Sequence, residues 1–268
     1  MSFGEFWCRF APAGRPSATS RGPWPTTAPG DPVGEYAARV IVVVGQPLFR
    51  ATADGARADG LPARIALAAA AHGRAVQLVG KAGEDADGDA VVLALTRGGV
   101  GHAALHRDAG QRTPRAVESL GDNPDSLGDD PGPPGDEAGD PTGADVPADE
   151  PAAWTALDAA DLDLALRYLA EYAVLVLADP TGPEVVGVAA EAAGYAGARL
   201  VVVVRPGETV PDGLAPDAIV FEAPDTDPDG VFASFVGSFA AALDDGDEPA
   251  AAFRSSIEAD GWTTSPDA

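Results

Sequence analysis

The sequence predicts a layered α/β domain with a mostly parallel β-sheet. Short runs of β-branched residues have the length and composition of strands that are buried on both faces of a sheet. Between these runs lie alanine-rich segments, several of which end in glycine, as helices often do. Strands that alternate with helices in this way are typical of a parallel sheet covered by helices.

The first half of the chain supplies three predicted strands and two predicted helices. Ordered sequence begins with a valine-rich run that ends in a glycine. The segment after it is rich in alanine and ends at Gly73, a residue suited to a helix C-cap. The predicted strands are residues 39–45 (RVIVVVG), 75–80 (AVQLVG) and 102–108 (HAALHRD), and the predicted helices are 60–73 (GLPARIALAAAAHG) and 87–99 (DGDAVVLALTRGG).

The second half repeats the alternation and ends in two helices. One strand contains four consecutive valines, which favours the centre of a parallel sheet. The predicted strands are residues 173–180 (AVLVLADP), 198–207 (ARLVVVVRPG) and 217–224 (DAIVFEAP), and the predicted helices are 157–172, 182–197, 232–246 and 248–261.

Two regions do not fit this pattern. Residues 1–36 are rich in Pro, Gly, Ser and Thr, which predicts a disordered tail. Residues 121–151 consist largely of Asp, Gly and Pro, a composition that buries too little apolar area to offset the entropy of ordering. We therefore expect one domain over residues 37–262, interrupted by an acidic disordered loop at 116–153 and followed by a short tail at 263–268.

Charge excludes several classes of partner. The formal net charge is −25, from 42 acidic residues against one lysine, Lys81, and sixteen arginines. Such a surface repels nucleic acids and anionic lipids, so we expect neither nucleic-acid nor membrane binding. A composition with many acidic residues and almost no lysine is typical of halophilic proteins. The alternative interpretation is an acidic protein from a GC-rich genome. We find no signal peptide and no run of about 18 apolar residues, which predicts a cytoplasmic protein.

Several common functional motifs are absent. Gly80-Lys81 lacks the upstream glycine and the following Ser or Thr of a Walker loop, and no GxGxxG follows a predicted strand. The sole cysteine, Cys8, excludes an intrachain disulfide and a cysteine metal site. His102 and His106 are four residues apart, but they fall at a predicted strand end, where that spacing does not imply a metal site.

One glycine pattern in the first half is specific. The segment 80–100 matches most of the fixed positions of GKxGxDxxGxxLxxxLxxxGV, and the preceding helix 60–73 has glycine at both ends. With the strand that ends at Gly45, this region resembles the N-terminal part of the ribokinase, or PfkB-type, family of carbohydrate and nucleoside kinases. The matching residues are Gly60, Gly73, Gly80, Lys81, Gly83, Asp85, Gly88, Leu95 and Val100.

A second match lies near the C-terminus. Residues 227–243 resemble, without gaps, the family signature DTTGAGDAFVGAFLAAL, and the agreeing residues are Asp227, Gly230, Phe235, Gly237, Phe239 and Leu243. The two matches cover somewhat over half the chain. The segment between them is shorter than the middle part of sequences in that family. The resemblance implies a ribokinase-like three-layer α/β/α sandwich. It also implies ATP with Mg²⁺ and a sugar or nucleoside ligand if the protein is active; a homodimer is left open.

The match fails at the positions that carry the family's chemistry. There, Gly-Ala-Gly-Asp holds the transferred phosphoryl group on backbone amides and supplies the Asp that takes the substrate proton. Here the four residues are Gly230, Val231, Phe232 and Ala233. Alanine accepts no proton, and we expect Phe232 to obstruct the anion hole, which leaves Gly230 as its remnant. Another register would offer Asp227 or Asp229 as the base.

The substrate side is altered as well. Arg64 stands where the family has a substrate-binding Asn, and Asp59 replaces the first glycine of its Gly-Gly turn. No Asp directly follows Gly45, although Asp54 farther on could substitute. Gly60, Arg64, Lys81 and Asp85 are therefore the candidate remnants of a substrate site, with a solvated surface lysine as the plainer interpretation of Lys81.

Three functions remain open from the sequence. The leading interpretation is a degenerate kinase homologue, a pseudokinase, with impaired or lost phosphoryl transfer and a retained small-molecule pocket. The alternatives are an active kinase that uses a displaced acidic base and a non-catalytic partner-binding or structural protein.

Overall fold

The computed structural model of the chain describes residues 40–53, 55–116, 157–169, 171–179 and 182–259. The two predicted tails, Asp54 and nearly all of the predicted acidic loop lie outside these residues. Ala116, where that loop is expected to begin, lies inside them and donates its backbone N–H to the carbonyl of Phe49. None of the helices in the described part of the chain is both long and apolar enough to span a bilayer.

A parallel sheet forms the centre of the molecule. Its strand order is β5-β4-β1-β7-β8-β9, and β6 pairs with the far end of β4. Every pairing in this sheet is parallel. The strands are β1 (Val40–Val44), β4 (Ala75–Gly83), β5 (Val100–Gly101), β6 (Leu105–Asp108), β7 (Tyr172–Leu177), β8 (Arg199–Val204) and β9 (Ile219–Glu222).

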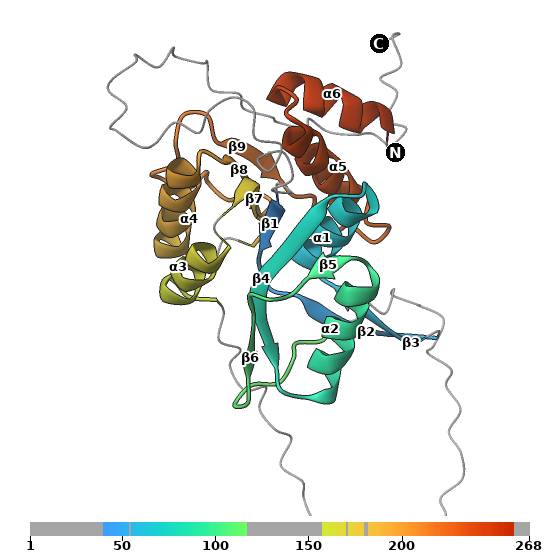
Figure 1. Ribbon diagram of the computed structural model, residues 1–268. Helices are drawn as coiled ribbons and strands as arrows, with labels where there is room; N and C mark the ends of the chain where they lie inside the picture. Colours follow the sequence, from blue (N-terminus) through green and yellow to red (C-terminus); the bar gives the residue numbers. More distant parts are fainter. Residues whose placement is uncertain (1–39, 54, 117–156, 170, 180–181, 260–268) are drawn as a thin grey trace, which may run out of the picture.

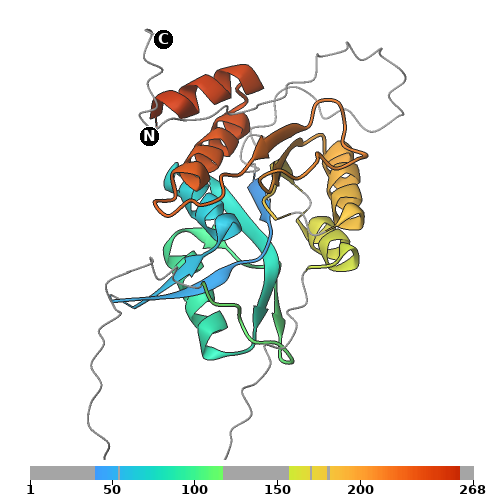
Figure 2. The same ribbon diagram turned by 180° about the vertical axis from the view of Figure 1, so that it is seen from behind.

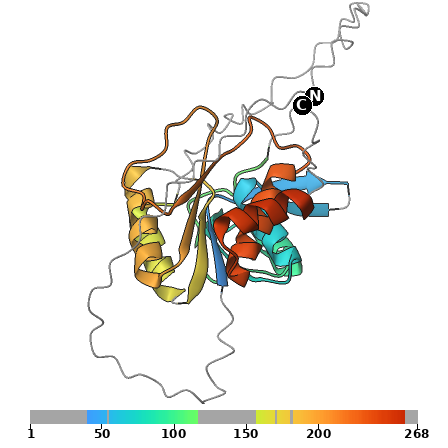
Figure 3. The same ribbon diagram turned by 90° about the horizontal axis from the view of Figure 1, so that it is seen from above.

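Helices cover both faces of the sheet, which confirms the three-layer prediction. Alternate residues of β1 enter two separate cores: Ile41 and Val43 pack with one helical layer, and Val42 and Val44 with the other. In Figure 3, α3 and α4 lie on one side of the sheet and α1, α5 and α6 on the other. The helices are α1 (Leu61–Ala71), α2 (Ala86–Arg97), α3 (Ala159–Tyr168), α4 (Pro183–Ala196), α5 (Val231–Asp245) and α6 (Pro249–Ala259).

Helices α1 and α5 touch closely at Gly237. A Cβ atom on Gly237 would lie 2.5 Å from the Cβ of Ala68 and 2.9 Å from the carbonyl oxygen of Ile65. Such distances are not sterically allowed, so only glycine permits this approach of the two helices. The contact fixes α1 and α5 relative to each other, and the N-terminal ends of both helices contribute to the candidate site.

The sequence analysis missed an antiparallel hairpin formed by β2 (Leu48–Thr52) and β3 (Gly55–Asp59). This hairpin forms its own two-stranded sheet beside α2, as Figures 1 and 2 show. The predicted helix at 157–172 is also wrong at its end, because α3 stops at Tyr168 and Tyr172 begins β7.

Candidate functional site

The carboxyl ends of β1 and β7 lie side by side at the point where the strand order reverses. Strands β4 and β5 continue the sheet on one side of β1, and β7, β8 and β9 continue it on the other. Open parallel sheets bind ligands at such a switch point. A cavity of about 280 Å³ lies here, and its lining includes Gln46 after β1, Gly60 before α1, and Asp179 after β7.

Asp179 is the acidic side chain of this cavity, and the sequence analysis did not select it. Burial raises the pKa of the Asp179 carboxyl, while Arg205, whose Nη2 lies 3.3 Å away, acts in the opposite direction. A partly buried acid that follows a central strand and has a raised pKa is a candidate acid or base. The sequence signal that could have identified Asp179 is its position just after the apolar run of β7.

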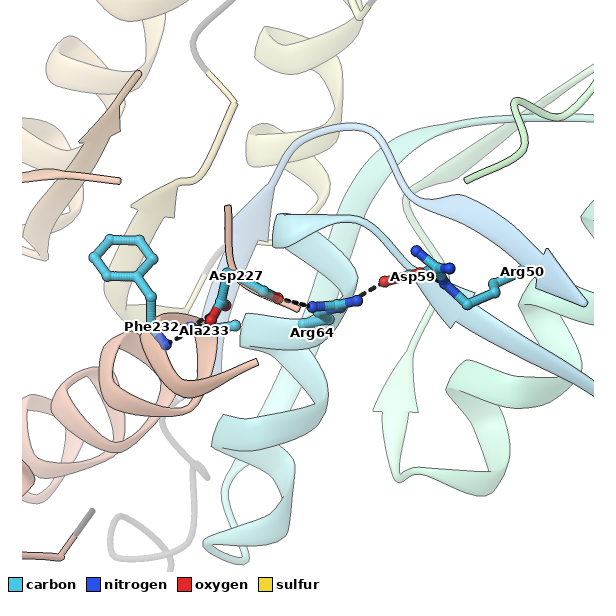
Figure 4. A network of polar contacts seen from close by, with 6 residues as sticks. All are labelled: Arg50, Asp59, Arg64, Asp227, Phe232 and Ala233. Carbon is cyan, nitrogen blue, oxygen red and sulfur yellow. Dashed lines mark hydrogen bonds and ion pairs between the residues drawn. The ribbon is translucent and has the colours of Figure 1, made fainter. Parts of the chain in front are cut away.

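Asp59 joins the hairpin to the start of α1. The guanidinium Nε atoms of Arg50 in β2 and of Arg64 in α1 both donate to its carboxylate (Figure 4). Burial raises the pKa of Asp59, but the two arginines outweigh this effect, so the pKa lies below its usual range. Gly60 follows with a φ of 83°, and a Cβ atom there would lie 3.0 Å from Cγ of Leu48.

Arg64 also reaches the segment that precedes α5. Its Nη1 donates to the backbone carbonyl of Asp227 at 2.5 Å (Figure 4). Arg64 therefore contacts the Asp59 carboxylate on one side and the segment that precedes α5 on the other. It connects two parts of the chain that are 163 residues apart in sequence.

The carboxylate of Asp227 caps helix α5. Its Oδ1 accepts the backbone N–H of Phe232 at 3.1 Å, and its Oδ2 accepts the backbone N–H of Ala233 at 3.0 Å. Gly230, with a φ of 72°, turns the chain into the helix. An acidic group at a helix N-terminus is favourable because it satisfies free amides and interacts well with the helix dipole.

Phe232 does not obstruct this helix end, so that expectation is wrong. The residue is only 2% exposed, and its side chain packs in the core formed with α1 and the sheet. Figure 4 shows the ring turned away from Asp227, Arg64 and Asp59. Phe232 lies within α5, where its backbone is helical, and the left-handed conformation belongs to Gly230. The Asp227 carboxylate, rather than an aromatic ring, occupies the amides.

A second, larger cavity of about 470 Å³ lies between the hairpin, α1, α2 and the start of α5. Ala233 and Gly230 line it, as do Arg64 and the exposed Asp229. Gly60 lines the smaller cavity instead. The predicted site residues are thus divided between two cavities, and Arg64 is close to both glycines: its backbone N–H donates to the carbonyl of Gly60, and its Nη1 lies 3.9 Å from where a Gly230 Cβ would be.

Lys81 and Asp85 line neither cavity. Lys81 is only 8% exposed and forms an ion pair of 2.6 Å with Asp161 of α3, so its interpretation as a solvated lysine is wrong. Asp85 is the N-cap of α2: it accepts the backbone N–H of Gly88 at 2.8 Å and the N–H and hydroxyl of Thr113. Burial raises the pKa of Asp85, and these hydrogen bonds outweigh it and lower the pKa overall.

Among the residues that the structure describes, no three His, Cys, Asp or Glu side chains are grouped as metal ligands. His72 is the C-cap residue of α1, and its Nε2 lies 2.9 Å from the Ser238 hydroxyl of α5. This contact gives His72 a structural role.

Comparisons with known proteins identify the fold. No protein-family model matches the sequence, and no curated protein matches it. Among solved structures, Arabidopsis thaliana ribokinase complexed with ribose and ATP is similar at 15% identity and a TM-score of 0.52, over 84% of this chain and 91% of that chain. A PfkB protein from Polaromonas sp. JS666 is similar at 17% identity and a TM-score of 0.51, over 85% and 98%.

A third similar structure is an E. coli protein assigned as a ribokinase II, in complex with ATP and Mg²⁺. It shares 14% identity with a TM-score of 0.53, over 82% of this chain and 90% of that chain. The chain has a ribokinase-like fold. This confirms the predicted fold class and the resemblance on which it rested.

Within the ribokinase-like fold, the two matched segments meet at one contact. The start of α1 and the start of α5 come together through Arg64 and Asp227. The glycines of the matched segments have structural reasons to be there: Gly60 and Gly230 have positive φ, and Gly237 permits helix contact. The two acidic candidate bases have different surroundings: the Asp227 carboxylate accepts two backbone amides, whereas Asp229 is exposed and lines the larger cavity.

Proposed function

We propose that this chain is a PfkB-type carbohydrate kinase homologue in which phosphoryl transfer is impaired or lost and a small-molecule cavity is retained. One observation carries the proposal: the Asp227 carboxylate accepts the α5 amides of Phe232 and Ala233. In the family that the chain resembles, amides at this helix start stabilise the transferred phosphoryl group. A carboxylate bound there competes with that group and repels its charge.

The side chain of residue 233 supports the same proposal. Ala233 lies in the first turn of α5, faces the larger cavity and carries no group that accepts a proton. Loss of a general base typically lowers a rate by about 10²- to 10⁴-fold. Loss of one anion-hole donor lowers it by about 10²- to 10³-fold. Either effect alone would make turnover at least about 100-fold slower than that of a kinase with both groups.

The test combines ligand binding with turnover. The melting temperature is measured with ATP–Mg²⁺, then with a panel of neutral sugars and nucleosides, and ADP release is followed in parallel with a competent ribokinase as positive control. We expect a rise in melting temperature with at least one ligand and no ADP release above background. Ligand-dependent ADP release at an ordinary kinase rate would contradict the proposal.

An active kinase with a displaced base is the second candidate, and the position of Asp229 favours it. This residue is exposed and lines the larger cavity together with Gly230 and Ala233. In that case ATP and Mg²⁺ would be the cofactors, and the substrate a sugar or nucleoside. ADP release that disappears in Asp229→Asn but persists in the matched variant Asp225→Asn would support this candidate. A complete lack of ligand response would instead favour a partner-binding protein.

A further inference from the structure

The larger cavity concentrates positive charge in a strongly acidic protein. Its lining includes four arginines, Arg50, Arg57, Arg64 and Arg97, against two acids, Asp59 and Asp229. The whole chain has a formal charge of −25. Acidic residues far outnumber basic ones in this chain, so a cavity lined at random would carry net negative charge. A local excess of two positive charges therefore requires a specific reason.

Two of these arginines have no carboxylate partner among the residues that the structure describes. Arg57 and Arg97 are exposed, and neither forms an ion pair or side-chain hydrogen bond with the described residues. Nine of the other ten described arginines have such a contact; the exception is Arg254, on α6. Two of the three unpaired arginines in the described ranges therefore line this one cavity.

The hairpin register adds an independent observation. Arg50 and Arg57 are direct cross-strand partners in the antiparallel β2–β3 pair. Like charges directly opposite each other destabilise a sheet. Asp59 pairs with Arg50, but Asp59 also pairs with Arg64, so a single carboxylate is shared between two guanidinium groups. The arrangement lacks negative charge that an anionic ligand would supply.

We propose that the larger cavity binds a small anionic molecule through Arg57 and Arg97, with a phosphate ester as the best match to the guanidinium groups. Guanidinium groups bind phosphate and carboxylate oxygens through paired N–H donors. A cavity of about 470 Å³ is the size of a small-molecule site. The inference rests on the proposed function in taking this cavity as the retained ligand site, and it specifies a charged ligand rather than a neutral sugar.

The experiment compares matched charged and neutral probes on the full chain. Glucose 6-phosphate, glucose, inorganic phosphate and succinate are titrated by calorimetry at low ionic strength and again at 1 M NaCl. The variants are Arg57→Ala, Arg97→Ala and the conservative Arg57→Lys, with Arg254→Ala as the matched control. Because Arg57 and Arg97 are exposed and unpaired, we expect these variants to fold, and their unliganded melting temperatures check this.

We expect glucose 6-phosphate to bind more tightly than glucose, and its Kd to rise about tenfold or more in Arg57→Ala and in Arg97→Ala. Arg254→Ala should leave the Kd unchanged. The Kd of Arg57→Lys should lie between those of the wild type and Arg57→Ala. Tighter binding of glucose 6-phosphate than of phosphate and succinate identifies a phosphate ester. Preference for succinate identifies a carboxylate ligand of the same site.

Two results would overturn the inference. One is equal Kd values for glucose 6-phosphate in the wild type, Arg57→Ala and Arg97→Ala. The other is binding of glucose but not of any anion, which would leave the proposed function intact. ADP release in the kinase assay, by contrast, would contradict the proposed function whatever the charge of the ligand, so the two failures are distinguishable.

Discussion

Asp227 and Ala233 form a hydrogen bond of 3.0 Å, from the backbone N–H of Ala233 to the carboxylate of Asp227, at the start of α5. The same carboxylate accepts the N–H of Phe232. The chain thus supplies its own anion at the helix end where the family resemblance implies a phosphoryl-binding site. The proposed loss of phosphoryl transfer has two causes: the α5 amides are occupied by the Asp227 carboxylate, and residue 233 carries no base.

The Asp227 cap contributes to stability, so Asp227→Ala should destabilise the protein. We expect a loss of about 1 kcal/mol, the usual value for a helix N-cap. Asp227→Asn keeps one acceptor oxygen and should lose less. Chemical denaturation measures both, with the exposed Asp225→Ala as control; identical stability of Asp227→Ala and the wild type would show that the cap is not made in solution.

Restoring the carboxylate at position 233 should not restore a kinase. Asp227 still covers the amides, and the new side chain would lie close to its negative charge. We expect Ala233→Asp to show no ADP release above background and a lower melting temperature than Ala233→Asn, which has the same size without the charge. Substantial activity from this single change would mean that the amides are open in solution.

Close packing at Gly237 makes the effect of an added methyl group depend on the helix. Gly237→Ala places a Cβ atom 2.5 Å from Ala68 and should cost about 1–3 kcal/mol through overpacking. Gly187→Ala in α4 meets nothing within 4 Å and should stabilise the protein by about 0.5–1 kcal/mol through helix propensity. Denaturation curves of the two variants should therefore shift in opposite directions; a shift in the same direction argues against the close α1–α5 contact.

Asp179 should make stability depend on pH in the unusual direction. Its pKa is raised in the folded state by burial, so the folded protein binds more protons than the unfolded chain between the two pKa values. Stability from this group is therefore present below the unfolded pKa of about 3.9 and is lost as pH rises through the folded pKa. Asp179→Asn should gain stability relative to the wild type between pH 4 and pH 7.

Denaturation at several pH values measures this difference. Arg205 lowers the pKa of Asp179, so Arg205→Ala should move the transition to higher pH. A constant difference between Asp179→Asn and the wild type across this range would contradict the assigned burial.

The ion pair between Lys81 and Asp161 should couple β4 to α3. A double-mutant cycle with Lys81→Ala and Asp161→Ala should give a coupling of about 1–2 kcal/mol at pH 7, since both side chains are largely removed from water. Burial raises the pKa of Asp161, but Lys81 outweighs it and lowers the pKa overall. The coupling should be complete above the unfolded pKa and vanish as pH falls through the folded pKa; a coupling that persists at pH 2 would exclude an ionic origin.

The regular elements could be predicted because their signals are local. Valine runs such as Val201–Val204 bury both faces of a strand, and the helices around them carry alanine and terminal glycines. The β2–β3 hairpin escaped prediction because Gly55–Asp59 (GARAD) is poor in β-branched and apolar residues. Its one local signal is the turn pair Asp54-Gly55 between two short runs.

The candidate site was only partly predictable because its contacts join distant residues. The proposed absence of a base at position 233 could be inferred from the sequence, since an alanine side chain has no proton acceptor in any conformation. The partners of Asp59, Lys81 and Asp227 depend on the fold, and so does the inward direction of Phe232, which follows from its phase on α5. Charge counting along the chain gave no hint that four arginines share one cavity.

The burial of Lys81 has a practical consequence. It is the sole lysine of the chain, and its ammonium group is held against Asp161 with only 11% of the side chain accessible. Amine-reactive reagents should therefore modify this residue slowly in the native protein and rapidly once β4 separates from α3. The acylation rate of one internal amine becomes a built-in reporter of local opening, read by mass spectrometry without any engineered label.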